Sequence, residues 1–553
     1  MKTHVSPRGA CVPYSGHGLA GHGESALASA ASAAMRARAR EAVIVVLSGA
    51  AGANWGHKKR VTVPTTSASF KQDLWLDFLE MRVLLCVPIL AAGFVPRGPI
   101  PSLARRRAAA LAAEPGAVYP RTAPARLPPP LVSDEPGTWA HDTMSRRVRE
   151  DILARVYSEN AGAAALEAAR PALDALEAEL EAAATTPLAP LADDGGADVA
   201  TWNAFLAPFV EAKATWLSAP WLVTEFYLYR RIVAAFDFWR TKYDPFAKQK
   251  RDGLDSAAGS IEALAARTNA ACAPAAAGDV GADDAAAFDR LFVQVSLWGN
   301  RMDLSIWPAG ENAASSAAGA DAFGAVLAAG EANLLADGTD ALLARVLAPA
   351  RARGGAARVD IVVDNAGFEL VTDLCLADWL VSSGACAQVA LRLKGHPTFV
   401  SDALAKDVIE TIDALEAGAA GADGARAAAR WREHVDAGRW LLDEDVYWAQ
   451  PFAFWEMPEH VTAALEEAAL VVLKGDANYR RLLGDRHWEL SEPFATVGRA
   501  FGARAPLLAL RTLKAELGCG IPEDQSARAA AADDQWLVSG KWGVIHFYHS
   551  DDD

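Results

Sequence analysis

A strand-like run in this chain, Val359-Asp360-Ile361-Val362-Val363, leads directly into the polar pair Asp364-Asn365. Two further runs lead toward carboxylates in the same way, residues 389–393 toward Asp402 and residues 470–473 toward Asp476. In open α/β sheets, ligands bind in the crevice beyond the carboxyl ends of the strands. Acidic and amide oxygens that gather there suit a hard divalent cation. The pattern therefore predicts metal-dependent chemistry on an anionic substrate.

The order of the segments predicts an α/β fold with a three-layer α/β/α core, a mainly parallel sheet and an N-terminal helical domain. Short Val/Leu-rich runs alternate with helical patterns over residues 346–553, which we expect to form the α/β metal-binding catalytic domain. Residues 127–345 show helical spacing of apolar side chains and predict a helical domain. Residues 1–126 are of low complexity and predict an extension that is either disordered or a targeting segment.

Composition restricts the class of protein. The 553 residues carry a net charge of −16, which argues against nucleic-acid binding because that needs a basic face. The longest apolar run, residues 83–95, is too short for a membrane span. None of the 6 cysteines forms a CxxC pair, so a reducing compartment is expected. We expect the protein in the cytoplasm, or in an organelle if the extension is a targeting signal; the oligomeric state stays open.

The strand-end residues have two interpretations. Asp364-Asn365 offers two oxygen donors on a short turn, which suits Mg²⁺ or Mn²⁺, but either residue is also a good cap for a following helix. Asp402 has the same alternative, for a helix expected from Ala403 to about Leu415. The residues alone leave these alternatives open.

Two segments supply candidate cations for a phosphate. Lys474 and Arg480 flank a turn at Gly475, a residue that permits close approach of the backbone. Arg511 and Lys514, in the string Arg-Thr-Leu-Lys, would share one face if the segment were helical. In both segments the alternative is a solvated surface charge.

Three polar residues stand in apolar helical surroundings: Asn300, Asp303 and Glu225. Such groups are either hydrogen-bonded inside the fold or support a site. The chain has no Walker A loop, no GxGxxG after a strand, no GxSxG and no HExxH. These absences leave nucleotide, nucleophilic-serine and zinc-protease chemistries without support.

Several strings occur together in one order and resemble the damage-control phosphatase family. The strings are Leu297-Trp298-Gly299-Asn300, residues 363–374, Phe399-Val400-Ser401-Asp402, Lys474-Gly475-Asp476-Ala477-Asn478-Tyr479-Arg480 and Arg511-Thr512-Leu513-Lys514. Within the family, the last string resembles the RTxK motif of the sugar-phosphate phosphatase branch. Members of this branch have also been called acidic-residue, or protein-glutamate, methyltransferases. The resemblance extends over about residues 127–548.

The resemblance implies a divalent metal, Mn²⁺, Ni²⁺, Co²⁺ or Mg²⁺, held by Asp364, Asn365 and Asp402. It implies substrate contacts for Asp476, Asn478, Tyr479, Arg480 and Lys514, and it implies Glu369 and Asp402 as methyl-donor contacts in the alternative activity. His396 departs from the family pattern, in which a smaller or hydroxyl-bearing residue is common.

The predicted function is metal-dependent hydrolysis of small sugar phosphates, of the fructose 1-phosphate or fructose 6-phosphate type, in metabolite damage control. Lys474, Arg480, Arg511 and Lys514 are the candidate cations for the phosphate, and the nucleophile is either Asp364 or a metal-bound water. The expected partners are small phosphorylated metabolites, with no nucleic acid. The alternative is S-adenosylmethionine-dependent protein-glutamate O-methyltransfer, which lacks a recognisable donor loop.

Overall fold

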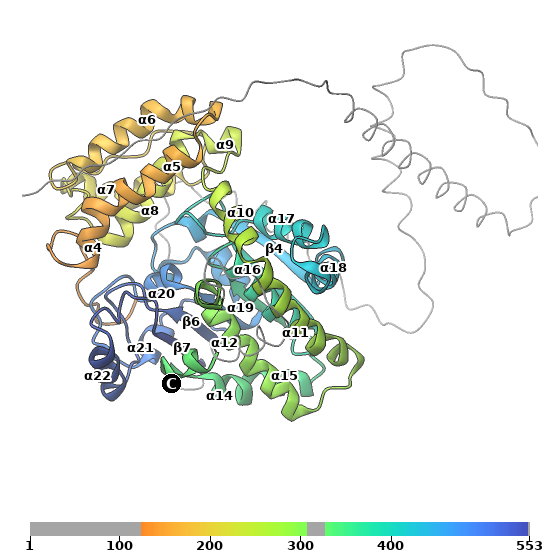
Figure 1. Cartoon of the computed structure of the whole chain (residues 1–553). Helices are drawn as coiled ribbons and strands as arrows, with labels where there is room; N and C mark the ends of the chain where they lie inside the picture. Colours follow the sequence, from red (N-terminus) through yellow and green to blue (C-terminus); the bar gives the residue numbers. More distant parts are fainter. Residues whose placement is uncertain (1–122, 307–326, 551–553) are drawn as a thin grey trace, which may run out of the picture. The chain divides into compact units, whose positions relative to one another are not determined.

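A mainly parallel β-sheet lies at the centre of the fold (Figure 1). The computed structural model describes residues 123–306 and 327–550, and its seven strands there follow the order β1-β7-β6-β5-β2-β3-β4. The strands are β1 (Leu334–Asp337), β2 (Arg358–Val362), β3 (Gln388–Lys394), β4 (Trp440–Asp445), β5 (Ala468–Lys474), β6 (Leu507–Thr512) and β7 (Gly543–Tyr548). Neighbouring strands from β6 to β4 are all parallel, and β7 runs antiparallel to β6.

The central strands β2, β3, β5 and β6 are buried on both faces, which explains why they are mainly apolar runs rather than alternating ones. In β5, Val471 and Leu473 belong to one hydrophobic core, whereas Leu470 and Val472 belong to another on the opposite face. Successive side chains of a strand point to opposite faces, so each face needs its own layer of helices. The sheet is therefore the middle layer of three.

One face of the sheet is covered by helices that come before, between and after strands β1, β2 and β3 in the sequence. They are α10 (Ala247–Ser256), α11 (Ala258–Ala277), α12 (Ala282–Ile306), α14 (Thr339–Leu342), α16 (Phe368–Ser382), α17 (Ala405–Glu416) and α18 (Gly421–Asp436). A π-helix, Leu343–Leu347, and α15 (Ala348–Ala352) follow α14. Helix α16 lies beside α11 and α12 (Figure 1).

The other face carries α19 (Glu459–Glu466), α20 (Asp476–Leu482), α21 (Phe494–Gly498) and α22 (Glu523–Ala532). The helices before α9 share this second core. They are α4 (Trp139–Asp142), a π-helix over Thr143–Leu153, α5 (Ala154–Glu159), α6 (Ala164–Glu181), α7 (Val199–Glu211) and α8 (Trp221–Ala235). Helix α9 (Phe238–Thr241) packs in a smaller cluster with Val233 and Leu404. The short 3-10 helices Val446–Ala449 and Phe454–Glu456 connect β4 to α19. This arrangement confirms the predicted fold class.

Some sequence predictions need correction or lie outside the described residues. Strand β6 contains Arg511, so Arg511 and Lys514 do not share a helix face. Most of the expected extension, residues 1–122, lies outside the described residues. The boundary at residue 346 stays a prediction, although β1 lies before it and belongs to the sheet.

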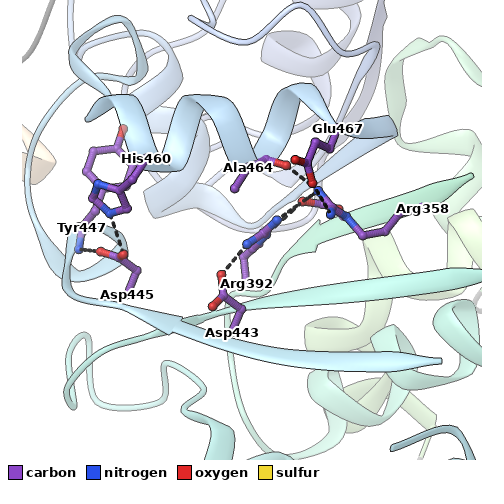
Figure 2. A network of polar contacts seen from close by, with 9 residues as sticks. Arg358, Arg392, Asp443, Asp445, Tyr447, His460, Ala464 and Glu467 are labelled. Atoms are coloured by element: carbon purple, nitrogen blue, oxygen red, sulfur yellow. Dashed lines mark hydrogen bonds and ion pairs between the residues drawn. The ribbon is translucent and has the colours of Figure 1, made fainter. Parts of the chain in front are cut away.

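A network of ion pairs connects β2, β3 and β4 with one another and with the end of α19 (Figure 2). Arg392 of β3 donates to Asp360 of β2 over 2.9 Å and also pairs with Asp443 of β4. Arg358 bonds Asp360 over 2.6 Å and reaches Glu467 at the end of α19. Both Asp360 and Arg392 are buried, and removing one partner of such a pair is strongly destabilising. The network fixes the mutual register of the strands whose ends carry the polar residues described below.

Candidate functional site

Strand β2 is the point at which the strand order reverses. From β2 the chain proceeds to β3 and β4 on one side, and it returns as β5 on the other. The helices that follow also separate, because α16 after β2 packs in one core and α20 after β5 packs in the other. A crevice at the carboxyl ends of the strands is expected at such a point. The polar segments after β2, β3 and β5 therefore converge where α/β proteins bind ligands.

The turn after β2 holds Asp364 and Asn365 in a polar network. Asn365 Nδ2 donates to Asp364 Oδ2 over 2.9 Å and to Glu369 Oε2 over 2.8 Å. Ser401 Oγ donates to Asn365 Oδ1 over 2.6 Å. Gly367 is the N-cap of α16, and no side chain caps that helix. The capping alternative for Asp364 and Asn365 is therefore wrong.

The loop after β3 brings Asp402 to this turn through a strained backbone. Phe399 and Val400 have φ angles of 42° and 67°, a region that is rare for a β-branched residue. Backbone hydrogen bonds then join the two loops, from Ala366 N to Ser401 O over 2.7 Å and from Ala403 N to Asp364 O over 2.9 Å. Helix α17 starts three residues after Asp402 with Leu404 as its N-cap, so Asp402 does not cap it.

Asp364 and Asp402 are buried, with 7% and 1% of their surfaces exposed. Burial raises the pKa of Asp364 well above its ordinary value, and the nearby charges of Asp402 and Glu369 raise it further. Burial also raises the pKa of Asp402, and Lys394 opposes this shift. Asp364 Oδ1 is enclosed without a hydrogen-bond partner. The two carboxylates thus form a buried acidic pair whose charge is not fully balanced by nearby cations.

Gly475, directly after β5, allows the backbone to pass close to the Asp364 carboxylate. Its backbone has φ +85° and ψ 171°, a conformation essentially confined to glycine. A Cβ atom at this position would lie 1.9 Å from Asp364 Oδ2. The backbone of the β5 loop therefore approaches the Asp364 carboxylate more closely than any side chain would allow.

Two buried lysines end the strands on either side of β2. Lys394 Nζ, at the end of β3, lies 3.2 Å from Asp402 Oδ2 and donates to Asn478 Oδ1 over 3.4 Å. Lys474, at the end of β5, turns toward α12 and α16, where its Nζ lies 2.8 Å from Asp373 Oδ1 and 3.7 Å from Glu369 Oε1. Burial alone would lower the pKa of Lys474, but the charges of Asp373 and Glu369 raise it. Lys474 is thus a paired internal cation.

Sequence reasoning missed Lys394 and Asp373. The signal for Lys394 was a lysine directly after an apolar strand, the same signal that drew attention to Lys474. Asp373 lies one helical turn after Glu369 on α16, and burial raises its pKa to about 6. Its Oδ1 also accepts a hydrogen bond from Ser296 Oγ over 2.7 Å. Neither role is visible without the long-range contacts.

The residues after Gly475 mostly contact protein groups. Arg511 Nε donates to Asp476 Oδ1 over 2.7 Å, and the backbone N of Lys514 reaches the same oxygen over 3.2 Å. Asn478 Nδ2 donates to the carbonyl of Lys474 over 2.9 Å. The Tyr479 hydroxyl lies 3.0 Å from His546 Nδ1. These contacts tie α20 to β6 and β7, and among the predicted phosphate cations they leave Lys514 only partly buried.

Arg480 connects α20 to α8. Its guanidinium donates to Asp485 Oδ1 over 2.8 Å and to Glu225 Oε2 over 2.6 Å, and it lies 3.7 Å above the Trp221 ring. Glu225 is thus hydrogen-bonded to Arg480, and its supporting role stays a prediction. Asn300 and Asp303 lie in α12, but their side chains are outside the described part of the chain.

His396 is buried and comes shortly before the strained residues Phe399 and Val400 in the loop after β3. Its Nε2 lies 3.8 Å from Asp198 Oδ2, and Asp198 in turn binds Arg230 over 2.8 Å. Burial lowers the pKa of His396. His396 thus lies next to the Asp198–Arg230 pair and precedes Asp402 by six residues in the chain.

The donor chemistry fits a hard divalent cation. Among the described residues, no three His, Cys, Asp or Glu side chains form a metal-binding group. The expected set instead combines two carboxylates with the amide of Asn365. Asp364 Oδ1 and Asp402 Oδ2 are both enclosed and lack a hydrogen bond, although Lys394 lies near the second. Oxygen atoms of this kind are the ligands that Mg²⁺ and Mn²⁺ prefer.

A sequence profile of the damage-control phosphatase ARMT1-like domain matches residues 140–529. The chain belongs to this family. It is 32% identical over 451 residues to the damage-control phosphatase ARMT1 of Rattus norvegicus, an alignment that covers 76% of this chain and 99% of the rat protein. The human protein of the same name is 31% identical over 451 residues, with 76% and 98% covered. That of Xenopus laevis is 31% identical over 435 residues, with 74% and 96% covered.

Membership confirms the family predicted from the ordered motifs and supports a hydrolase of the phosphatase class. The matched region contains the whole candidate site, from Glu225 to Lys514. No helix in the described part of this damage-control phosphatase-family chain is both long and apolar enough to cross a membrane.

Proposed function

We propose that this chain is a divalent-metal-dependent phosphomonoesterase that hydrolyses small sugar phosphates. The observation that carries the proposal is the buried acidic pair of Asp364 and Asp402 at the switch point of the sheet. Burial and mutual repulsion disfavour ionisation of both carboxyl groups in the protein alone. A bound cation reverses that penalty, because it favours the charged form of each ligand.

Asp364, Asn365 and Asp402 would hold the cation, which we expect to be Mn²⁺, Ni²⁺, Co²⁺ or Mg²⁺. Such an ion supplies electrostatic stabilisation of the charge that develops on a transferring phosphoryl group. The protein positions this set rigidly: Gly475 admits the Asp364 carboxylate, Ser401 orients Asn365, and Lys394 holds Asp402.

Lys514 is the cation that we assign to the substrate phosphate. It lies two residues after β6 and is partly buried, and its charge lowers the pKa of Asp364. We assign Arg480 and Arg511 an indirect role, without contact to the phosphate. Each uses its guanidinium to fix an acidic neighbour, Asp485 or Asp476.

The substrate class is proposed from the family resemblance, with ketose phosphates such as fructose 1-phosphate as the preferred example. The test is release of inorganic phosphate from fructose 1-phosphate by the purified chain with Mn²⁺, compared with the same sample after chelation. We expect turnover that depends on the metal. Turnover unaffected by chelation, or absent with every divalent metal and sugar phosphate tried, would overturn the proposal.

The same preparation distinguishes the methyltransferase alternative. We expect no heat of binding when S-adenosylmethionine is titrated into the Mn²⁺-loaded chain. Saturable binding, together with methyl transfer to protein carboxylates and no phosphate release, would favour the alternative instead.

A further inference from the structure

Helix α8 contacts both the loop after β3 and the helix after β5. Tyr229 of α8 packs on Phe399 of the β3 loop, with ring centroids 4.9 Å apart. Glu225, one helical turn earlier, accepts a hydrogen bond from Arg480 of α20, which follows β5. Strand β2 lies between β3 and β5 in the sheet. The face of α8 that carries Glu225 and Tyr229 therefore spans the gap beyond β2, where Asp364 and Asn365 lie.

Both side chains keep polar atoms without a protein partner. Tyr229 is 6% exposed, yet its hydroxyl has no hydrogen bond among the described residues, and Glu225 is 9% exposed and uses only Oε2. Neither unused oxygen is fully enclosed by protein. By contrast, the hydroxyl of Tyr227 donates to the Ala189 carbonyl over 2.7 Å. A nearly buried tyrosine hydroxyl normally finds a partner, so these two oxygens point to a ligand.

The charges around this face indicate which part of a ligand it receives. Burial raises the pKa of Tyr229, and the charges of Glu225 and Asp402 raise it further. Burial likewise raises the pKa of Glu225, Arg480 opposes the shift, and Asp485 and Asp476 reinforce it. Arg480 already engages Glu225 through Oε2, so the second carboxylate oxygen and the Tyr229 hydroxyl suit hydrogen bonds with neutral hydroxyl groups.

We infer that Glu225 and Tyr229 form a hydroxyl-binding subsite for the sugar part of the phosphorylated substrate. This inference rests on the proposed function and deepens it. The Glu225 carboxylate accepts hydrogen bonds from one or two substrate hydroxyls, and the Tyr229 hydroxyl either donates or accepts one. The phosphate lies at the opposite end of the crevice, toward Lys514. A site built for hydroxyls discriminates against phosphate esters that lack them, because its buried polar groups are then left unpaired.

The test compares two substrates in the Mn²⁺-loaded chain, fructose 1-phosphate and p-nitrophenyl phosphate, which has no polyol. For Tyr229→Phe we expect the KM for fructose 1-phosphate to rise about tenfold, the effect of losing one hydrogen bond, with kcat little changed. The kcat/KM for p-nitrophenyl phosphate should stay at the wild-type value. Tyr227→Phe, which removes a hydroxyl bonded to Ala189 instead, is the matched control and should behave as wild type.

Glu225→Gln should also raise the KM for fructose 1-phosphate selectively. This change weakens the pair with Arg480 as well. If the glutamine variant does not fold, the result for Tyr229→Phe alone decides the test. Equal loss on both substrates, or no loss on fructose 1-phosphate, overturns the subsite. A wild-type chain that hydrolyses p-nitrophenyl phosphate but shows no preference for the sugar ester also overturns it, while leaving the phosphatase proposal standing. Wild-type inactivity on both substrates, and on other sugar phosphates with every divalent metal tried, rejects the proposed function itself.

Discussion

Replacing Gly475 by alanine is the most informative single change in this site. The new Cβ would lie 1.9 Å from Asp364 Oδ2 and 2.1 Å from Cγ of the same carboxylate. Ordinary contacts begin near 3.4 Å, so the carboxylate or the loop must move by about 1.5 Å, the difference between 3.4 Å and 1.9 Å. The carboxylate cannot retreat without loss, because Asn365 holds the same oxygen over 2.9 Å.

The displacement has two separable effects. A shift of about 1 Å in a reacting or ligating group lowers a rate by roughly 100-fold, so we expect Gly475→Ala to lose about that much kcat/KM. The backbone conformation of Gly475, φ +85° and ψ 171°, adds strain of about 1–3 kcal/mol for any other residue. The first effect acts on Mn²⁺ binding and turnover, and the second acts on the free energy of unfolding.

The assay pairs Mn²⁺ titration calorimetry with phosphate release from fructose 1-phosphate. Gly418→Ala is the matched control, because Gly418 also has a positive φ, +92°, but nothing lies within 4 Å of its added Cβ. Both variants should lose stability, and only Gly475→Ala should lose metal affinity and turnover. If Gly475→Ala binds Mn²⁺ and turns over as well as Gly418→Ala, the packing of Gly475 against a functional Asp364 is refuted.

Two further predictions concern buried charges. Lys394→Met should lower the free energy of unfolding of the metal-free chain by about 3–5 kcal/mol, because Asp402 loses its partner, and Mn²⁺ should restore much of it; equal losses in chemical denaturation with and without Mn²⁺ would contradict this role. His546 accepts a hydrogen bond from Tyr479 at Nδ1 only when neutral, and burial lowers its pKa from 6.5 to about 4. The folded-state pKa is depressed, so this stabilisation is present above pH 6.5 and lost toward pH 4, by about 3 kcal/mol for 2.5 pH units. Urea denaturation across that range should show a shallower loss in His546→Gln than in the wild type, and parallel curves would be inconsistent with the buried neutral histidine.

The fold was predictable because its signals are local. The run that ends at Val363 is apolar on both faces, which is typical of a central parallel strand. The segment from Leu370 to Leu380 is mainly apolar, and it forms most of the buried helix α16.

The site was predictable only in part. Whether a charged side chain is paired or solvated depends on residues that are distant in the sequence. Lys474 and Arg480 were expected to face a phosphate, but Asp373 and Glu225 engage them from 101 and 255 residues away in the chain. Lys394 was overlooked although it ends an apolar strand as Lys474 does, because its pairing is visible only in the fold. Its partner Asn478 lies 84 residues further on. Local sequence identifies which groups are present and leaves their pairing undetermined.

The most direct test of the central claim is Mn²⁺ binding to the purified chain and to the double variant Asp364→Asn, Asp402→Asn, with phosphate release from fructose 1-phosphate measured on the same samples. The account predicts one tightly bound Mn²⁺ per wild-type chain with metal-dependent turnover, and a folded double variant that has lost both. A folded double variant that still binds Mn²⁺ with wild-type affinity and still releases phosphate would contradict it.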